Sequence, residues 1–340
     1  FESEGYDRTS MKLPKCQDRL IEEVLKVQPN VVVVLHNGSP VELPWADRVS
    51  AILEMYLGGQ GVGEACDWLL FGEANPSGRL AETFPYRLED NPSFLHFPGN
   101  EKRVLYGEDI FVGYRYYDTK KVPVRYAFGH GLSYTEFTYG DLTLSSAQMT
   151  DEDILTVSLK VKNSGKTEGK EVVQLYVADL CGTPERPVKE LKGFAKVHLL
   201  PGEEKTVSME ISARNLSYYE ERLGDWYAPS GTYRILIGHA SDDIRLHADI
   251  VFKTKKKLPL RVDFTTTFGE LLDHTKTAPV ITELLAPLAA AAASAEGMSD
   301  EYKKLGEQVI REMPLKFLLG QMPGEQVEQL IGQLNCLLAQ

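Results

Sequence analysis

The sequence predicts a multidomain chain: a layered α/β part with a mostly parallel sheet, then a β-sandwich, then an α-helical C-terminal extension. Three patterns support this. Apolar residues follow helical spacing or continuous runs in the first third, alternate with polar residues in the middle, and form Ala-rich and helical stripes at the end. The 340 residues also exceed what one hydrophobic core usually serves. We expect domains at 1–137, 138–252 and 253–340.

The α/β part is expected to begin with a helix and a buried strand. Residues 13–26 carry apolar side chains at helical spacing behind Pro14, which suits a first helical turn. The continuous β-branched run at 31–35 is typical of a parallel strand buried on both faces. A second apolar run at 51–57 leads through a glycine loop into a helix at 64–71. This alternation predicts a layered βαβ-type arrangement.

From about Thr138 the pattern changes to a period of two. Half-buried antiparallel strands alternate apolar and polar residues in this way, and turns rich in Gly, Pro and Asn separate them. The alternating runs are 154–161, 172–177, 206–211 and 233–237. Their spacing predicts a β-sandwich of about 110 residues.

The tail is expected to be helical. It begins with the basic run Lys253–Lys257, which we interpret as a solvated linker. Thr267-Phe-Gly-Glu270 has the spacing of a capping box, and residues 286–295 are rich in Ala, the best helix former. The last helices offer an apolar stripe that must be buried against another surface. Its members are Val327, Leu330, Ile331 and Leu334.

The charge balance limits the partners that the chain can have. Lys and Arg number 37 against 49 Asp and Glu, which gives a formal net charge of −12. A negative field disfavours polyanions, so we expect neither nucleic acid nor a membrane as a partner. No stretch approaches the roughly 18 consecutive apolar residues of a membrane span. The localisation stays open between cytoplasmic and secreted.

No pattern predicts a cofactor or a metal. The glycine loop at 58–63 has neither the Gly-Lys-Ser/Thr of a phosphate-binding loop nor the spacing of a dinucleotide fingerprint, so we expect a tight structural turn. The seven His show no metal spacing, and the four Cys are scattered as isolated thiols. Ser39 lacks the nucleophile elbow of a serine hydrolase.

What remains is a group of carboxylates at the start of the sequence. Glu2, Glu4 and Asp7 crowd an irregular segment beside Arg8. Irregular segments on a rigid scaffold often carry catalytic groups. Taken alone, however, such a cluster is more typical of a solvated terminus than of a catalytic site.

A resemblance begins at these residues. In order along the chain, a series of motifs resembles the second and third domains of glycoside hydrolase family 3 β-glucosidases. The motifs include Glu4-Gly-Tyr-Asp-Arg8, Asn37-Gly-Ser-Pro40, Asn75-Pro-Ser-Gly-Arg-Leu80, Val112-Gly-Tyr-Arg-Tyr-Tyr-Asp118, Phe128-Gly-His-Gly-Leu-Ser-Tyr-Thr135 and Arg186-Pro-Val-Lys-Glu-Leu-Lys-Gly-Phe194.

The resemblance implies a fold and an activity. The family combines a (β/α)8 barrel that bears an Asp nucleophile, an α/β sandwich that supplies the general acid/base, and a fibronectin type III-like domain. It implies hydrolysis of terminal non-reducing β-linked sugars with retention, by a pair of carboxyl groups. By motif match Glu4 corresponds to the acid/base, and Asp7 with Arg8 to a pair that supports its loop. Glu2 has no such match.

The sequence also departs from the family. No barrel motif is present, so the resemblance implies a partial α/β sandwich, whose partner is the barrel-containing part of the same enzyme. We expect that the apolar stripe of the tail is covered either by that barrel or by a second subunit. The second case would make the enzyme a homo-oligomer. The alternative function is a non-catalytic module for carbohydrate binding or assembly, in which Trp45, Trp68 and Trp226 could stack on sugars.

Overall fold

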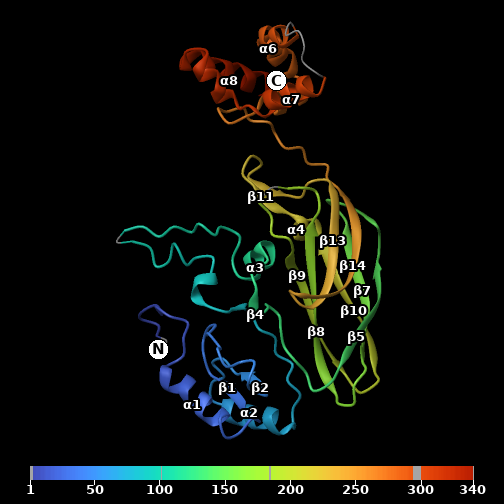
Figure 1. Ribbon diagram of the computed structural model, residues 1–340. Coiled ribbons are helices and arrows are strands. Elements are labelled where there is room, and N and C mark those ends of the chain that lie inside the picture. The colour runs from blue at the N-terminus through green and yellow to red at the C-terminus, as the bar shows by residue number, and fades with distance from the viewer. Residues whose placement is uncertain (1–2, 101, 184, 294–299, 340) are drawn as a thin grey trace. The chain divides into compact units, whose positions relative to one another are not determined.

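The computed structural model describes residues 3–100, 102–183, 185–293 and 300–339. Glu2 therefore lies outside the described residues. The chain forms two compact units (Figure 1). The first comprises Phe1–Tyr218 and Trp226–Lys255, and the second comprises Tyr219–Asp225 and Lys256–Gln340. The α/β part and the sandwich thus share one unit, while the boundaries at 137 and 252 stay predictions.

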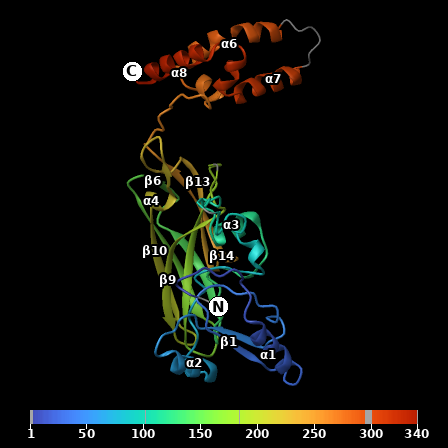
Figure 2. The same ribbon diagram turned by 90° about the vertical axis from the view of Figure 1, so that its left-hand side faces the viewer.

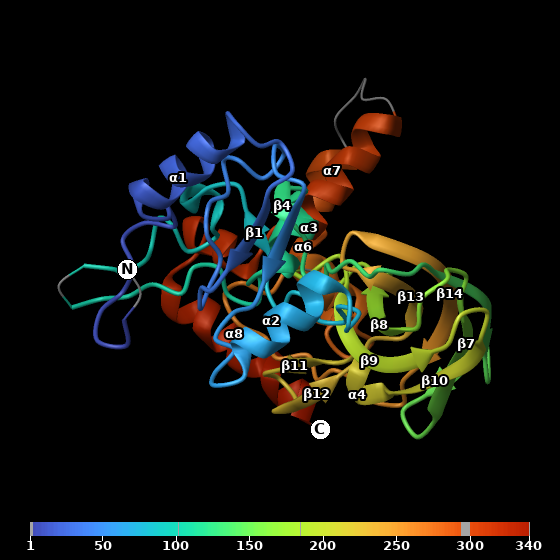
Figure 3. The ribbon, with the colours of Figure 1, turned by 90° about the horizontal axis from the view of Figure 1, so that it is seen from below.

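The α/β part begins as expected. Helix α1 (Lys15–Leu25) starts behind Pro14, and strand β1 (Val32–Leu35) pairs in parallel with β2 (Ala51–Glu54). Helix α2 (Val62–Phe71) follows the glycine loop and ends at Gly72, whose φ of 80° favours glycine. Figures 2 and 3 show α1 and α2 on opposite sides of the strand pair. The helix, strand and loop order predicted for this part is confirmed.

The described strands bear out the α/β part only coarsely, and they differ from the expectation in two details. The short strands β3 (Phe84–Pro85) and β4 (Val124–Tyr126) pair antiparallel, so the described strand pairs of this part are mixed rather than mostly parallel. Strand β1 is also not buried on both faces, because Val32 is 47% exposed. Apolar runs show that a strand can be buried, but they do not specify its neighbours.

The core of the α/β part lies where β1 meets the loops that follow it. Trp45 is fully buried there, and its indole Nε1 donates to Asp18 on α1 at 2.9 Å. Val33, Leu35 and Phe84 pack in the same cluster. Between β3 and β4 the chain forms the short helices η1 (Leu88–Asp90) and α3 (Tyr114–Lys120), separated by a long irregular segment.

The middle of the chain is a two-layered β-sandwich, as predicted. One sheet has the order β10-β7-β5 and the other β6-β14-β13-β8-β9. Side chains from both sheets form one apolar core that includes Val157, Leu175 and Ile235. The four predicted runs lie within β7, β8, β10 and β13. The strands are β5 (Phe137–Leu144), β6 (Gln148–Thr150), β7 (Ile154–Asn163), β8 (Gly169–Asp179), β9 (Glu190–Leu199), β10 (Glu204–Ser212), β13 (Gly231–Ala240) and β14 (Asp243–Lys253), and the short α4 (Ala213–Leu216), β11 (Tyr218–Glu220) and β12 (Asp225–Tyr227) connect β10 with β13.

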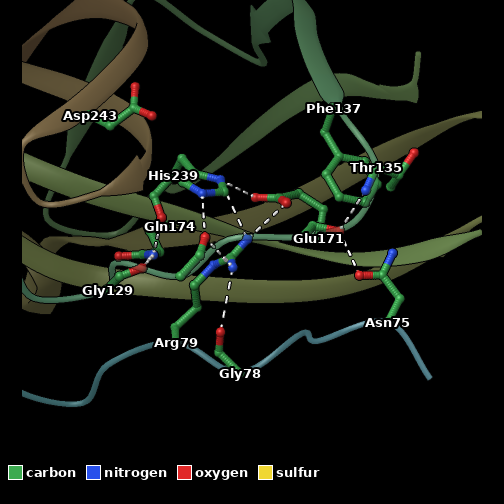
Figure 4. Close-up of polar contacts among 12 residues, drawn as sticks. Asn75, Gly78, Arg79, Gly129, Thr135, Phe137, Glu171, Gln174, His239 and Asp243 are labelled. Carbon is green, nitrogen blue, oxygen red and sulfur yellow. Dashed lines mark hydrogen bonds and ion pairs between the residues drawn. The ribbon is translucent and has the colours of Figure 1, made fainter. Parts of the chain in front are cut away.

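A buried polar cluster joins the α/β part to the sandwich (Figure 4). The carboxylate of Glu171 on β8 is fully buried and accepts from Arg79 Nη2 at 2.9 Å and from the Tyr139 hydroxyl at 2.7 Å. His239 on β13 lies 2.7 Å from the same carboxylate. Beside them the Gln174 amide donates to the carbonyl of Gly129, whose φ of 81° requires glycine. Breaking such a buried charge pair typically costs about 3–5 kcal/mol.

The second unit is helical. Its elements are α5 (Phe268–Asp273), α6 (Ala278–Ala293), α7 (Asp300–Glu312), η2 (Leu315–Gly320) and α8 (Gly324–Ala339). The predicted capping box is confirmed, because Thr267 Oγ1 accepts from the Glu270 amide and the Glu270 carboxylate accepts from the Thr267 amide. Of the Ala-rich run, residues 294 and 295 lie outside the described part. No helix among the described residues is long and apolar enough to span a membrane.

The expectation about which surface covers the apolar stripe of the tail is wrong. Val327 and Leu334 are fully buried, and Leu330 and Ile331 pack against the same cluster. The surfaces that bury them come from the tail itself, above all Phe268, Leu271, Ile281, Leu315 and Leu318. A helical stripe identifies which face is buried, but its partner depends on how the neighbouring helices fold back. Neither a barrel nor a second subunit is needed to cover this face.

Since the tail has its own core, we predict that it folds as an autonomous unit. Trypsin should cleave the native chain at Lys257 or Arg261, which are exposed in the irregular connection, and should leave a resistant fragment that mass spectrometry can identify. Leu334→Ala should abolish this resistance, because truncating a buried Leu costs about 2–5 kcal/mol. Leu319→Ala, at a side chain that is 48% exposed, is the matched control. A tail digested as fast as an unfolded chain would refute autonomy.

Candidate active site

The candidate site is built on the irregular segment that precedes α1. Glu4 lies in this segment with its side chain exposed, next to Gly5, whose amide donates to Ser3 Oγ at 3.1 Å. Asp7 and Arg8 follow within the same loop. The three residues that the motif singled out are therefore neighbours in a surface loop rather than members of a regular element.

Arg8 anchors this loop to the connection that follows β1. Its Nη2 atom donates to Ser39 Oγ at 2.6 Å and to the carbonyl of Pro40 at 2.9 Å. Asn37, which is only 6% exposed, donates from Nδ2 to the carbonyl of Ser39 at 2.9 Å and shapes the connection that receives the guanidinium. The motif Asn37-Gly-Ser-Pro40 thus forms the docking point for the segment that bears Glu4.

A second attachment lies on the far side of the loop. Met11 is buried, and its carbonyl accepts from the amide of Glu42 at 2.9 Å. The segment is thus fixed at Arg8 and at Met11, and the side chain of Glu4, which precedes both, is exposed. A carboxyl group in this position is exposed to solvent, yet it is carried by a backbone that two contacts hold in place.

A cavity of about 760 Å³ opens beside this loop. Asp7, Arg8 and Met11 form one wall, and Glu82 and Thr83 at the start of β3 form another. The segment between η1 and α3 closes the third side. It contributes Phe94, Phe97, Glu108 and Val112. Glu4 is not among the residues that line the cavity.

The cavity wall combines acidic, hydroxyl and aromatic groups. Thr83 Oγ1 and Glu108 Oε2 are buried atoms with no hydrogen-bond partner among the described residues. Burial, reinforced by nearby Asp90, raises the pKa of Tyr117, so its phenol stays neutral. Unpaired buried oxygens favour a ligand or a protein group that can hydrogen-bond to them. Such a wall suits a polar partner with hydroxyl or amine groups.

Sequence reasoning found only part of this wall. Asp7 and Arg8 were singled out by the motif. Glu82, Glu108, Phe94 and Phe97 were missed, because they come from segments that are distant in sequence and have no periodicity. Nothing in the sequence showed that the hydroxyl of Thr83 is buried against a cavity.

The contacts in the structure bear on three other kinds of site, namely a serine nucleophile, a sugar-stacking Trp and a metal site. Ser39 Oγ accepts from Arg8, so it is occupied as an anchor. Trp45 is buried, and the ring of Trp226 stacks with the Arg214 guanidinium at 3.1 Å, while Trp68 is 44% exposed. No group of three metal-ligating side chains occurs in the part of the chain that the structure describes.

The basic run also lacks the features of a polyanion site. The Lys255 amide donates to the Asp151 carboxylate at 2.7 Å, and Lys255 Nζ donates to the Glu152 carboxylate at 3.1 Å. Lys256 Nζ donates to Asp225 at 2.7 Å. Neighbouring acids therefore already balance much of this positive charge.

Family models match two regions of the chain. Residues 1–134 match the glycosyl hydrolase family 3 C-terminal domain, and residues 171–241 match the fibronectin type III-like domain. The first region contains the loop with Glu4 and the whole cavity wall. The second contains Glu171 on β8 and the strands β9, β10 and β13.

Curated relatives are similar over much of the chain. Thermostable β-glucosidase B of Acetivibrio thermocellus is 47% identical over 339 residues, which cover 98% of this chain and 44% of that protein. A β-glucosidase of Kluyveromyces marxianus is 46% identical over 260 residues, covering 76% of this chain and 30% of that protein. The chain thus spans less than half of the length of either relative.

Solved structures show the same similarity. The K. marxianus β-glucosidase in complex with glucose matches 74% of this chain with a TM-score of 0.70 and 43% identity, covering 30% of that chain. The family 3 β-glucosidase of Bifidobacterium adolescentis matches 82% of this chain with a TM-score of 0.74 and 38% identity, covering 41% of that chain.

We predict that Arg8 determines the order of the loop. Arg8→Gln should remove both contacts to the 37–40 connection. Each is a hydrogen bond from a charged donor, and such a bond contributes about 1.5–3 kcal/mol to stability. Amide hydrogen exchange of residues 3–10 should then be faster. Lys12→Met, at an exposed side chain two residues from the loop end, is the control and should leave exchange unchanged. Equal exchange in wild type and Arg8→Gln would show that Arg8 is no anchor.

Proposed function

Since the chain contains the C-terminal domain of glycosyl hydrolase family 3 followed by a fibronectin type III-like domain, we propose that it is the acid/base-bearing part of a retaining β-glycosidase. In this proposal residues 1–137, 138–252 and 253–340 are its α/β, sandwich and tail parts. The observation that carries the proposal is the Glu4-Gly-Tyr-Asp-Arg8 loop, which Arg8 anchors beside a polar cavity.

Glu4 is proposed as the general acid/base. Retention requires one carboxyl group that attacks the anomeric carbon and another that protonates the leaving oxygen and then activates water. The exposed side chain of Glu4 can reach a sugar held outside this chain, while its backbone is fixed through Arg8 and Met11. Asp7, which lines the cavity next to Arg8, is proposed to support the loop.

The nucleophile is proposed to come from the part of the longer enzyme that this chain does not contain, a barrel domain. The relatives are more than twice as long as the matched region. An exposed apolar surface adjoins the cavity on the segment between η1 and α3, which projects in Figure 1. Leu95 is 86% exposed, Tyr106 79% and Phe97 50%. Apolar surface of this extent favours a protein partner.

The same proposal covers the substrate and the other partners of the enzyme. Relatives named β-glucosidases, one of them solved with glucose, support a terminal β-glucoside or oligosaccharide as the substrate. The net charge of −12 argues against nucleic acid and anionic membranes. We also propose that β1 and β2 belong to a larger, mostly parallel sheet completed by strands outside this chain. A homo-oligomer remains open within this proposal.

In the complete enzyme we predict that Glu4→Ala selectively slows substrates with poor leaving groups. Only these need protonation of the leaving oxygen, so their kcat/KM should fall by about 10²–10⁴-fold while activated aryl glycosides lose far less. Azide should restore turnover of the activated substrates. Glu73→Ala, at another exposed carboxylate, is the control. Equal losses on both substrate classes, or no effect of azide, would rule out the acid/base role.

We further predict that this chain by itself hydrolyses no aryl β-glucoside. Retention needs two carboxyl groups about 5–5.5 Å apart on either side of the sugar, and the proposed nucleophile lies outside the chain. The assay is release of the aryl group by the purified 340-residue chain, with its Glu4→Ala variant prepared in parallel. Activity that disappears in the variant would contradict the prediction, because a contaminating host enzyme would act equally in both samples.

A further inference from the structure

A segment of the sandwich, residues 186–192, is bound to helix α3 of the α/β part. It includes the start of β9, and Figure 1 shows α3 beside that strand. Four consecutive residues of the segment contact the helix. The Val188 amide donates to Thr119 Oγ1 at 3.1 Å, Lys189 Nζ lies 2.8 Å from Asp118 Oδ2, Arg115 Nη2 lies 3.4 Å from Glu190 Oε1, and the Leu191 amide donates to the Tyr114 hydroxyl at 2.7 Å. We call residues 186–192 the clamp segment.

These contacts use a single face of α3. The helix residues that they engage are Tyr114, Arg115, Asp118 and Thr119. At 3.6 residues per turn, positions spaced in this way lie on one side of a helix, and Tyr117 lies on the opposite side. Tyr117 is buried and lines the candidate cavity, together with Val112 and Gly113 just before the helix. Helix α3 therefore lies between the clamp segment and the cavity.

Helix α3 cannot hold this position by itself. It has seven residues, and isolated helices of that length are unstable in water. No side chain among the described residues caps its start, where Gly113 adopts a φ of 56°. Its place is therefore set by tertiary contacts. The clamp segment holds the helix at both ends, through Tyr114 at the start and Thr119 near the end.

The clamp segment is itself firmly attached to the sandwich. The Glu190 carboxylate accepts from Arg186 Nη2 at 2.7 Å and lies 3.4 Å from Lys192 Nζ, and these three side chains are largely buried. Burial would raise the pKa of Glu190, but the charges of Lys192 and Arg186 outweigh burial and lower it, so the carboxylate is ionised. Between Leu191 and Gly193 the pairing with β8 shifts register, which makes Lys192 a β-bulge. Such bulges bend a strand and redirect its side chains.

We propose that the clamp segment, acting through Tyr114, positions the α3 wall of the cavity and so determines how firmly the enzyme holds the leaving group of its substrate. This inference rests on the proposed function. A general acid/base protonates the leaving oxygen, so the departing group lies on the side of the Glu4 loop, where the cavity opens. Tyr114 is not among the residues that line the cavity, so it acts as a positioning residue. The sandwich thereby influences a site to which it contributes no lining residue.

The first test compares two tyrosines of α3 in the 340-residue chain. Tyr114→Phe removes the acceptor of the Leu191 amide but keeps the ring, which stacks on Phe128 with centroids 4.7 Å apart. Amide exchange of α3 should then rise about tenfold, because a partly buried amide loses its partner. Tyr116→Phe removes a hydroxyl from the opposite side of the helix and should leave exchange unchanged. Equal exchange in the two variants would overturn the proposal.

A second pair of variants tests another contact of the clamp segment. Lys189→Met removes the cation that lies 2.8 Å from Asp118, and Lys120→Met removes an exposed Lys from the opposite side of the same helix. Exchange of the α3 amides should rise in the first variant and stay at the wild-type rate in the second. If both variants raise exchange alike, or if neither does, the clamp segment does not position α3.

The third test is kinetic and uses the complete enzyme. For a β-linked glucose disaccharide, Tyr114→Phe should raise KM about tenfold and leave kcat within about twofold, because the leaving sugar is held less firmly while the chemical step is unchanged. An aryl glucoside, whose leaving group is small and largely apolar, should keep its KM. Tyr116→Phe should change neither substrate.

The kinetic outcomes separate this inference from the function on which it rests. Equal changes of KM for both substrates, or an unchanged KM for the disaccharide in Tyr114→Phe, would overturn the positioning role. A wild-type complete enzyme that hydrolyses neither substrate would instead refute the proposed function. In that case the two exchange tests, which need no activity, still decide whether the clamp segment positions α3.

Discussion

The carboxylate of Glu171 is fully buried, and the structure around it is arranged to supply the donors that it requires. Arg79 reaches it from the α/β part, Tyr139 from one sheet and His239 from the other. An ionised group in the protein interior is stable only when it is paired and hydrogen-bonded, so these three elements must come together whenever the sandwich folds. This requirement couples the α/β part to the sandwich more specifically than apolar contact would. It also explains why both share one compact unit.

The helical tail follows a different rule. Its core is apolar and closed, with Phe268, Leu271 and Leu334 fully buried, and it needs no donor from the rest of the chain. Close apolar packing satisfies the tail locally, because dispersion and burial have no direction. The two units thus illustrate two ways of stabilising a fold, one by directional pairing across a joint and one by local burial.

The candidate site depends on a compromise between exposure and order. The acid/base role proposed for Glu4 requires a carboxyl group that reaches a bound sugar and yet is held within a fraction of an ångström of its productive position. Glu4 is exposed, while Arg8 and Met11 fix the backbone around it. The apolar face next to the cavity is the opposite case, because Leu95 and Tyr106 are largely exposed among the described residues. Both features are consistent with a site completed by another part of a longer protein.

The sequence by itself determined the local structure and the family. Alternation placed the central strands at 154–161, 172–177, 206–211 and 233–237, the spacing of Thr267 and Glu270 gave the capping box, and ordered motifs gave the resemblance that the family models bear out. These signals are short-range, because period and capping depend on residues a few positions apart.

Only the tertiary structure decided which surfaces meet. It paired β3 with β4 antiparallel, buried the tail stripe within the tail, and brought Glu82 and Glu108 to one cavity. Arg79, Glu171 and His239 lie up to 160 positions apart in the sequence, and no pattern marked them as partners. Periodicity specifies which face of an element is buried but not what covers it, because the partner depends on the path of the whole chain and on the hydrogen bonds that buried polar groups must find.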